Sequence, residues 1–71
     1  MPRVDGTHSP PGGADPGDNH LAGFNHAMRD ALQKADNALG PGSHRVAVRF
    51  NAVLETRSPG RVREYSVVLE S

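Results

Sequence analysis

The sequence predicts an α+β fold in which one amphipathic helix packs on a long antiparallel β-hairpin, after an N-terminal tail without fixed structure. Two patterns carry this prediction. Apolar residues recur at spacings of three and four between Leu21 and Leu39, and they alternate with polar residues from His44 onwards. A chain of 71 residues allows one small domain at most. We therefore expect an αββ domain over residues 20–71 and a tail over residues 1–19.

The first 19 residues are rich in Pro, Gly and Asp, and Val4 is the only Leu, Ile, Val or Phe among them. Such a segment cannot bury enough apolar surface to offset the conformational entropy that it loses on ordering. We therefore expect residues 1–19 to be disordered.

The segment from Leu21 to Leu39 is predicted to form the helix. Its apolar stripe consists of Phe24, Met28, Ala31, Leu32, Ala35 and Leu39. Because alanine occupies part of this stripe, the layer that packs on the helix should come close to it. The candidate N-caps are Asp18, Asn19 and Asn25, and the helix should end at Gly40-Pro41-Gly42.

Two strands are predicted, from His44 to Thr56 and from Arg61 to Glu70, because apolar and polar residues alternate in both. Between them, Pro59-Gly60 fits the centre of a type II turn. A four-residue loop at 57–60 then sets the register of the hairpin. The facing pairs on the apolar face are Ala52 with Tyr65, Phe50 with Val67, and Val48 with Leu69. On the second, mixed face the pairs are Asn51 with Ser66 and Arg49 with Val68. We expect the apolar face to meet the helix.

A single helix on two strands gives a thin core, and a domain below roughly 70 residues rarely gains more than about 3–5 kcal/mol from one core. Both strands of an isolated hairpin also have unpaired edges. We therefore expect other copies of the chain to cover the second face and the edges in a homo-oligomer. Two alternatives remain open. The chain could fold poorly by itself, or it could be an interaction module whose exposed strand edge pairs with a different protein.

The composition argues against several other functions. The net charge is zero, so the arginines of the hairpin are expected to pair with its glutamates and not with nucleic acid. The sequence has no cysteine, which leaves no disulfide and no thiolate metal site, and in so small a domain this favours the cytoplasm. No apolar run approaches the length of a membrane span, and the N-terminus lacks the apolar core of a signal peptide.

The titratable side chains do not form a motif for catalysis or metal binding. The four histidines are His8, His20, His26 and His44. His20 and His26 are six residues apart, so they do not share a helix face as metal ligands four residues apart do. We expect a non-enzymatic protein without a metal. We expect His8, His20 and His26 to be exposed to solvent. His44 is the exception among the histidines, because it lies beside a glycine-rich corner and could stack on a ligand.

Two segments resemble the dodecins, which are small flavin-binding proteins. The segments are FNHAMRDALQKA (24–35) and GRVREYSVVL (60–69). The matching residues are Ala27, Met28, Ala31, Leu32 and Ala35 in the helix, and Gly60, Val62, Tyr65 and Val67 in the last strand.

This resemblance implies a β-α-β-β subunit whose long hairpin wraps around the helix, an assembly of subunits into a hollow shell, and flavins stacked between aromatic rings. The family's first strand has no clear counterpart beyond a stub at residues 2–6, and its flavin-stacking tryptophan is missing, with His44 near its place. Ser66 replaces a glutamine of the family. We therefore expect a homo-oligomer that binds or stores a small ligand, with flavin as one candidate. The residues expected to contact it are His44, Asn51 and Ser66.

Overall fold

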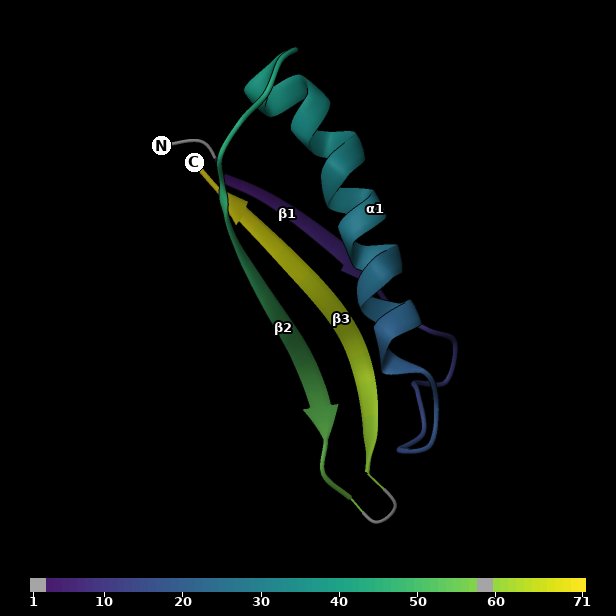
Figure 1. Cartoon of the computed structure of the whole chain (residues 1–71). Helices are drawn as coiled ribbons and strands as arrows, with labels where there is room; N and C mark the ends of the chain where they lie inside the picture. Colours follow the sequence, from purple (N-terminus) through teal and green to yellow (C-terminus); the bar gives the residue numbers. More distant parts are fainter. Residues whose placement is uncertain (1–2, 58–59) are drawn as a thin grey trace.

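The computed structural model describes residues 3–57 and 60–71, and over these residues the chain forms one helix and one three-stranded antiparallel sheet (Figure 1). The elements, in chain order, are β1 (Arg3–His8), α1 (His20–Leu39), β2 (Ala47–Glu55) and β3 (Arg61–Glu70). The strand order is β1-β3-β2, so the C-terminal strand lies in the middle of the sheet. The predicted α+β class, with a helix on an antiparallel hairpin, is confirmed.

The structure corrects the prediction of a disordered tail, because residues 3–8 form β1. This strand pairs antiparallel with β3 from Arg3↔Glu70 to His8↔Tyr65. The loop that follows is also attached to β3, since the backbone of Ala14 makes hydrogen bonds of 2.7 and 2.8 Å with that of Val62. Main-chain pairing therefore attaches this segment to β3, and such pairing leaves no trace in its composition. Only two small apolar side chains of the segment, Val4 and Ala14, are buried in the core.

The helix begins and ends where glycine and asparagine predict. Asn19 is the N-cap, with its side-chain oxygen accepting a hydrogen bond from the Ala22 nitrogen at 3.4 Å, which selects one of the three candidate caps. Gly40 follows the last turn with a φ of 78°, a conformation that glycine adopts without strain. The predicted C-terminal end of the helix is confirmed.

The face of α1 that meets the sheet is made of its smallest residues, Gly23, Ala27 and Ala31. Opposite them, Gly6 of β1 has no room for a side chain, since a Cβ there would overlap the backbone of Ala27 and Ala31. The predicted close packing is confirmed, but the buried stripe is displaced by about one position from the predicted one. Phe24, Met28 and Ala35 flank it and are partly buried, whereas Leu32 is 59 % exposed.

The hairpin register is the predicted one over most of its length. All five predicted pairs are present, from Val48↔Leu69 to Ala52↔Tyr65. Beyond Val53↔Glu64 a bulge at Arg63 shifts the register by one residue, so Leu54 faces Val62. β2 is shorter than predicted, and β3 has the predicted bounds. The predicted type II turn involves Pro59, which is outside the described residues.

The core lies between α1 and the β1–β3 part of the sheet. It consists of Val4, Ala14, Ala27, Ala31, Tyr65, Val67 and Leu69. Figure 1 shows α1 running along β1 and β3, while β2 lies beyond its cover. On the opposite face of the sheet, Arg49 pairs with Glu70 and Arg3 with Asp5, around Val68, which is 5 % exposed. None of the described residues forms a helix with the length and hydrophobicity needed to cross a membrane.

Candidate functional site

Tyr65 is the centre of the aromatic part of the structure. It lies on β3 and is only 2 % exposed, with its ring beneath Gly23, where an added Cβ would overlap it. The Phe24 ring meets it edge-on, at a centroid distance of 4.9 Å. Its hydroxyl lies 2.6 Å from Nδ1 of His20, the first residue of α1. Tyr65, the only tyrosine of the chain, is therefore enclosed by the structure, and its hydroxyl group contacts the imidazole of His20.

The hydrogen bonds of His20 define which nitrogen carries the proton. Nε2 lies 3.2 Å from the carbonyl oxygen of Pro16, which can only accept, so the Nε2–H donates to it. In the neutral ring Nδ1 then accepts from the Tyr65 hydroxyl. Burial raises the pKa of Tyr65, and the negative charge of Asp18 raises it further, so the phenol keeps its proton and donates. The pair ties the loop before α1 to the centre of β3.

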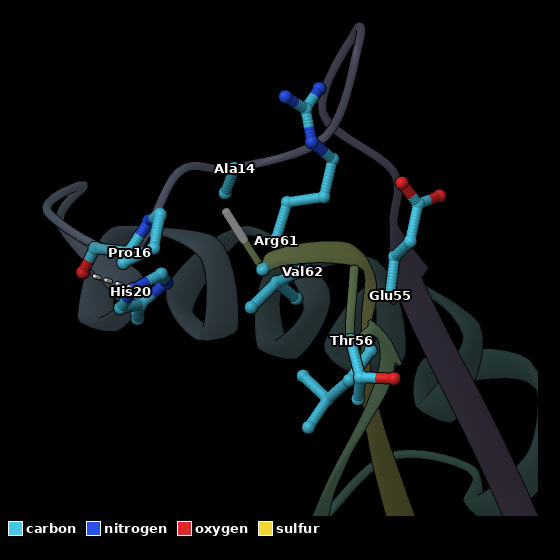
Figure 2. A pocket seen from close by; sticks show the side chains of 9 residues that line it. Ala14, Pro16, His20, Glu55, Thr56, Arg61 and Val62 are labelled. Carbon is cyan, nitrogen blue, oxygen red and sulfur yellow. Dashed lines mark hydrogen bonds between the residues drawn. The ribbon is translucent and has the colours of Figure 1, made fainter. Parts of the chain in front are cut away.

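An apolar cavity of about 260 Å³ lies beside this pair, at the end of the hairpin (Figure 2). Its lining is Ala14, Pro16, His20, Leu54, Glu55, Thr56, Gly60, Arg61 and Val62. Figure 2 shows His20 and Pro16 at one end and Thr56 and Glu55 at the other. The Arg61 guanidinium hydrogen-bonds the Gly12 carbonyl oxygen and lies 3.7 Å from Asp15, so its charge is used to hold the loop. The cavity suits an apolar or aromatic group.

A second cavity, also of about 260 Å³, lies at the other end of the molecule, between the C-terminal half of α1 and the residues just before β2. Leu32, Leu39, Val46 and Leu69 form its apolar walls, and His44 is at its edge. The two cavities are thus both bounded by β2 or the residues next to it, on the side of the sheet that carries the helix.

Between the two cavities, the helix side of β2 exposes its large side chains. We call Val48, Phe50, Ala52 and Leu54 the open face of β2. Val48, Phe50 and Leu54 are 41, 57 and 62 % exposed, although their β3 neighbours Leu69 and Val67 are 4 and 0 % exposed. The Phe50 ring contacts Phe24 of α1 edge-on at 5.5 Å, which is the main link between the helix and this strand. The open face is a continuous apolar strip with nothing over most of it.

The structure brings together two of the three residues predicted to contact a ligand. Asn51 faces Ser66 across the hairpin, and the Ser66 hydroxyl donates to the main-chain oxygen of Asn51 at 3.3 Å. His44 lies apart, three residues before β2, with Nε2 3.0 Å from the Gly40 carbonyl oxygen. It borders the cavity on the helix side, whereas Asn51 and Ser66 are on the opposite face of the sheet. A flavin ring is therefore not held by these three residues within one chain.

The polar contacts that sequence reasoning missed involve histidines expected to be exposed to solvent. His20 bonds Tyr65, and the His8 and His26 rings stack with a centroid distance of 4.6 Å. The sequence offers no signal for the second pair, because β1 itself was not predicted. Among residues 3–57 and 60–71, no group of three or more His, Cys, Asp or Glu side chains is placed to hold a metal ion.

No protein-family model, curated protein or solved structure matches this chain.

Proposed function

We propose that this chain is the subunit of a cytoplasmic homo-oligomer that binds or stores a small apolar or aromatic ligand between its subunits and catalyses no reaction. The observation that carries the proposal is the open face of β2. A strip of Val48, Phe50 and Leu54 exposed by 41–62 % lies directly beside β3, where Tyr65, Val67 and Leu69 are almost fully buried. Burying one such side chain completely contributes roughly 1.5–3 kcal/mol, so the strip favours association.

The cavity beside His20 supports the ligand part of the proposal. Its volume of about 260 Å³ is slightly below the range of roughly 300–1,000 Å³ typical of small-molecule sites. Leu54 belongs both to its lining and to the open face of β2, so a subunit that covers this face also closes the cavity. The enlarged site would hold a flat apolar ligand against Leu54 and Val62, with the Thr56 hydroxyl at its edge.

The polar groups around the cavity support binding without catalysis. His20 and Tyr65 bond each other and Pro16, and Arg61 is engaged by the loop before α1. A catalytic acid, base or nucleophile needs a free position within reach of the substrate. These groups instead hold the loop of residues 9–19 against the sheet.

The element order β-α-β-β also supports the proposal, because it is the order that the dodecin resemblance implies. It makes flavin the first ligand to test. Because His44 lies apart from Asn51 and Ser66, a flavin that contacts all three positions needs residues from more than one subunit.

The test is size-exclusion chromatography with light scattering over a range of concentrations, with visible absorbance recorded across the peak. We expect an oligomer that Leu54→Ser dissociates and Leu21→Ser leaves intact. Both leucines are exposed, by 62 and 76 %, but only Leu54 belongs to the open face. Titration with riboflavin, followed by its fluorescence, tests the ligand. A colourless monomer at every concentration, with no quenching of riboflavin, would overturn the proposal.

One observation favours a second candidate, an interaction module. In the sheet of the described residues β2 pairs with β3 alone, so one edge of a nine-residue strand has unpaired backbone groups. A strand of a different protein could pair with this edge. That function predicts a monomer by light scattering and a complex of one-to-one stoichiometry with the other protein.

A further inference from the structure

The edge of β2 and its open face are complementary to a second copy of themselves. We propose that two chains associate by antiparallel pairing of β2 with β2, about a two-fold axis at Phe50, to form a continuous six-stranded sheet. This inference rests on the homo-oligomer proposed above and names the contact between its subunits.

Symmetry restricts the number of registers. In a two-fold antiparallel pair of identical strands, facing residues lie on the same side of the sheet, so one residue must face its own copy at the axis. Every other residue then faces the one at an equal distance on the far side of the axis. For β2 the registers worth comparing are those centred on residues 49 to 53.

The charges of β2 favour the axis at Phe50. In that register Arg45 faces Glu55 of the partner subunit, and the symmetric pair repeats the contact. Arg45 is exposed and makes no ion pair among the described residues, whereas Glu55 is half-buried, with Arg63 at 3.8 Å. An axis at Asn51 would bring Arg45 against Arg57 of the partner subunit. Axes at Arg49 or Val53 would also bring two arginines face to face.

An axis at Ala52 also avoids facing arginines, but both its charged and its apolar pairs are less favourable than those of the Phe50 axis. It would pair Arg49 with Glu55 of the partner subunit, although Arg49 already holds Glu70 within its own chain. It would also place Val48 opposite a threonine, Thr56. Between residues 46 and 54, the Phe50 axis instead gives only apolar pairs on the helix side: Val46 with Leu54, Val48 with Ala52, and Phe50 with itself. Apolar cross-strand pairs of this kind stabilise a sheet.

The pairing gives the exposed apolar residues of β2 cross-strand neighbours on both faces of the sheet. Phe50 already meets Phe24 edge-on, so the axis would gather four aromatic rings from two chains. On the other face, Val53, which is 55 % exposed, faces Ala47 of the partner subunit. β2 begins at Ala47, so the Arg45–Glu55 pair extends the ladder by two residues before the strand.

The pairing also completes the cavity beside His20. Thr56, at its edge, comes opposite position 44, and therefore near His44 of the partner subunit. The residue that sequence analysis favoured for stacking on a ligand would then reach the cavity from the second chain. Each dimer would have two such composite sites, one at each end of the paired strands.

Charge reversal tests the register. Arg45→Glu and Glu55→Arg each turn two facing ion pairs into two repulsive pairs, and we expect each to raise the dimer dissociation constant about tenfold. An equimolar mixture of the two variants restores both pairs, so it should form a heterodimer near wild-type affinity. Arg57→Glu is the matched control, because it makes the same change of charge outside the paired segment. Sedimentation equilibrium gives the constants, and circular dichroism checks that each variant is folded.

Cross-linking tests the axis independently of charge, because the chain contains no cysteine. Facing residues in an antiparallel pair have Cα atoms about 4.5–5.5 Å apart, within the range that a disulfide bridges. Phe50→Cys should therefore oxidise to a covalent dimer. Ala52→Cys should not, since its copy would lie four residues along the strand, about 13 Å away.

The outcomes separate this inference from the function on which it rests. An oligomer that keeps its affinity in Arg45→Glu and Glu55→Arg, or whose mixed variants fail to recover it, would overturn the register and leave the homo-oligomer standing. Cross-linking through Ala52→Cys in place of Phe50→Cys would also overturn the register. A wild-type chain that stays monomeric would overturn both.

Discussion

The helix side of the sheet consists of two parts with opposite environments, although β2 and β3 share the same alternating sequence pattern. On β1 and β3, Val4, Tyr65, Val67 and Leu69 are at most 4 % exposed. On β2, Val48, Phe50 and Leu54 alternate in the same way, but they are 41–62 % exposed. Alternation of apolar residues therefore shows which side of a strand is apolar, and it does not show whether a helix covers that side.

The dimensions of the elements explain the difference. A helix with its side chains is about 10–12 Å wide and neighbouring strands are about 4.8 Å apart, so one helix covers about two strands. Gly6 lets α1 approach β1 until their backbones are in contact, which draws the helix to the β1–β3 side. The third strand is left open as a consequence of the close packing of the other two.

The largest effect is expected where the backbones touch. Gly6→Ala should lower the free energy of unfolding by about 3 kcal/mol, because its Cβ would overlap the backbone of Ala27 and Ala31, which cannot move aside as a flexible side chain can. Chemical denaturation measures the change. Gly17→Ala is the control: no atom lies within 4 Å of its added Cβ, and its effect should stay within about 0.5 kcal/mol. A fully stable Gly6→Ala protein would contradict the close packing of α1 on β1.

The same substitution on β3, which α1 covers, and on β2, which it leaves open, compares the two parts of the sheet directly. Val67→Ala removes two methyl groups at a site with no exposure, and should cost about 2 kcal/mol. Val48→Ala, at a site 41 % exposed, should cost less than about 0.5 kcal/mol in dilute protein. Unfolding measured again at high concentration should show a larger cost for Val48→Ala, because association covers it. Equal costs at both sites in dilute protein would remove the distinction between the two parts.

Much of this fold was predictable from the sequence, because helix caps and a short hairpin loop act between residues that are close along the chain. Asn19 and Gly40 mark the ends of α1 by their own conformations, and the five hairpin pairs follow from a short loop and the sizes of facing residues. Arg63 shows the limit of that reasoning, since the bulge there depends on geometry that no alternation pattern records.

Contacts between distant segments were not predictable. β1 pairs with a strand some sixty residues later through its backbone, and Val4 is its only large apolar residue. Without β1, the helix was expected to cover the hairpin, and His8 and His20 were expected to face solvent. The part of the site around Tyr65 was missed for this reason, because His20 contacts both Tyr65 and Pro16 of the N-terminal segment.

A smaller effect is expected at the hydrogen bond between Tyr65 and His20, in the part of the sheet that α1 covers. Tyr65→Phe should cost about 1 kcal/mol, since it removes the hydrogen bond to His20 and leaves that nitrogen unpaired. The raised pKa of Tyr65 also predicts a pH dependence. The neutral phenol is favoured in the folded chain, so its contribution is complete below the unfolded pKa of roughly 10 and is lost as pH rises through the folded value.

The alkaline experiment is direct because Tyr65 is the only tyrosine. Tyrosinate absorbance of the folded chain should rise at higher pH than that of the chain in denaturant, and the alkaline loss of stability should be weaker in Tyr65→Phe. Coincident titration curves in the two states would show that Tyr65 is open to solvent, and would place the boundary between the covered and open parts elsewhere.

The smallest effect is expected at Asp30, which joins α1 to β1 at the edge of the covered part. Its carboxylate accepts a hydrogen bond of 3.0 Å from the Thr7 nitrogen and lies 3.0 Å from Lys34 Nζ. The Thr7 hydrogen bond, and then Lys34, lower the pKa of Asp30. The stability that ionised Asp30 contributes is therefore present above the unfolded pKa of about 3.9, and it is lost as pH falls through the folded pKa.

Asp30→Asn should thus be slightly less stable than wild type at neutral pH, and the difference should vanish in acid. Asp36→Asn, on the exposed side of the same helix, should have the stability of the wild type at neutral pH and in acid. If Asp30→Asn kept its deficit in acid, the loss would come from packing and not from charge, and the link between α1 and β1 would need no ionised carboxylate.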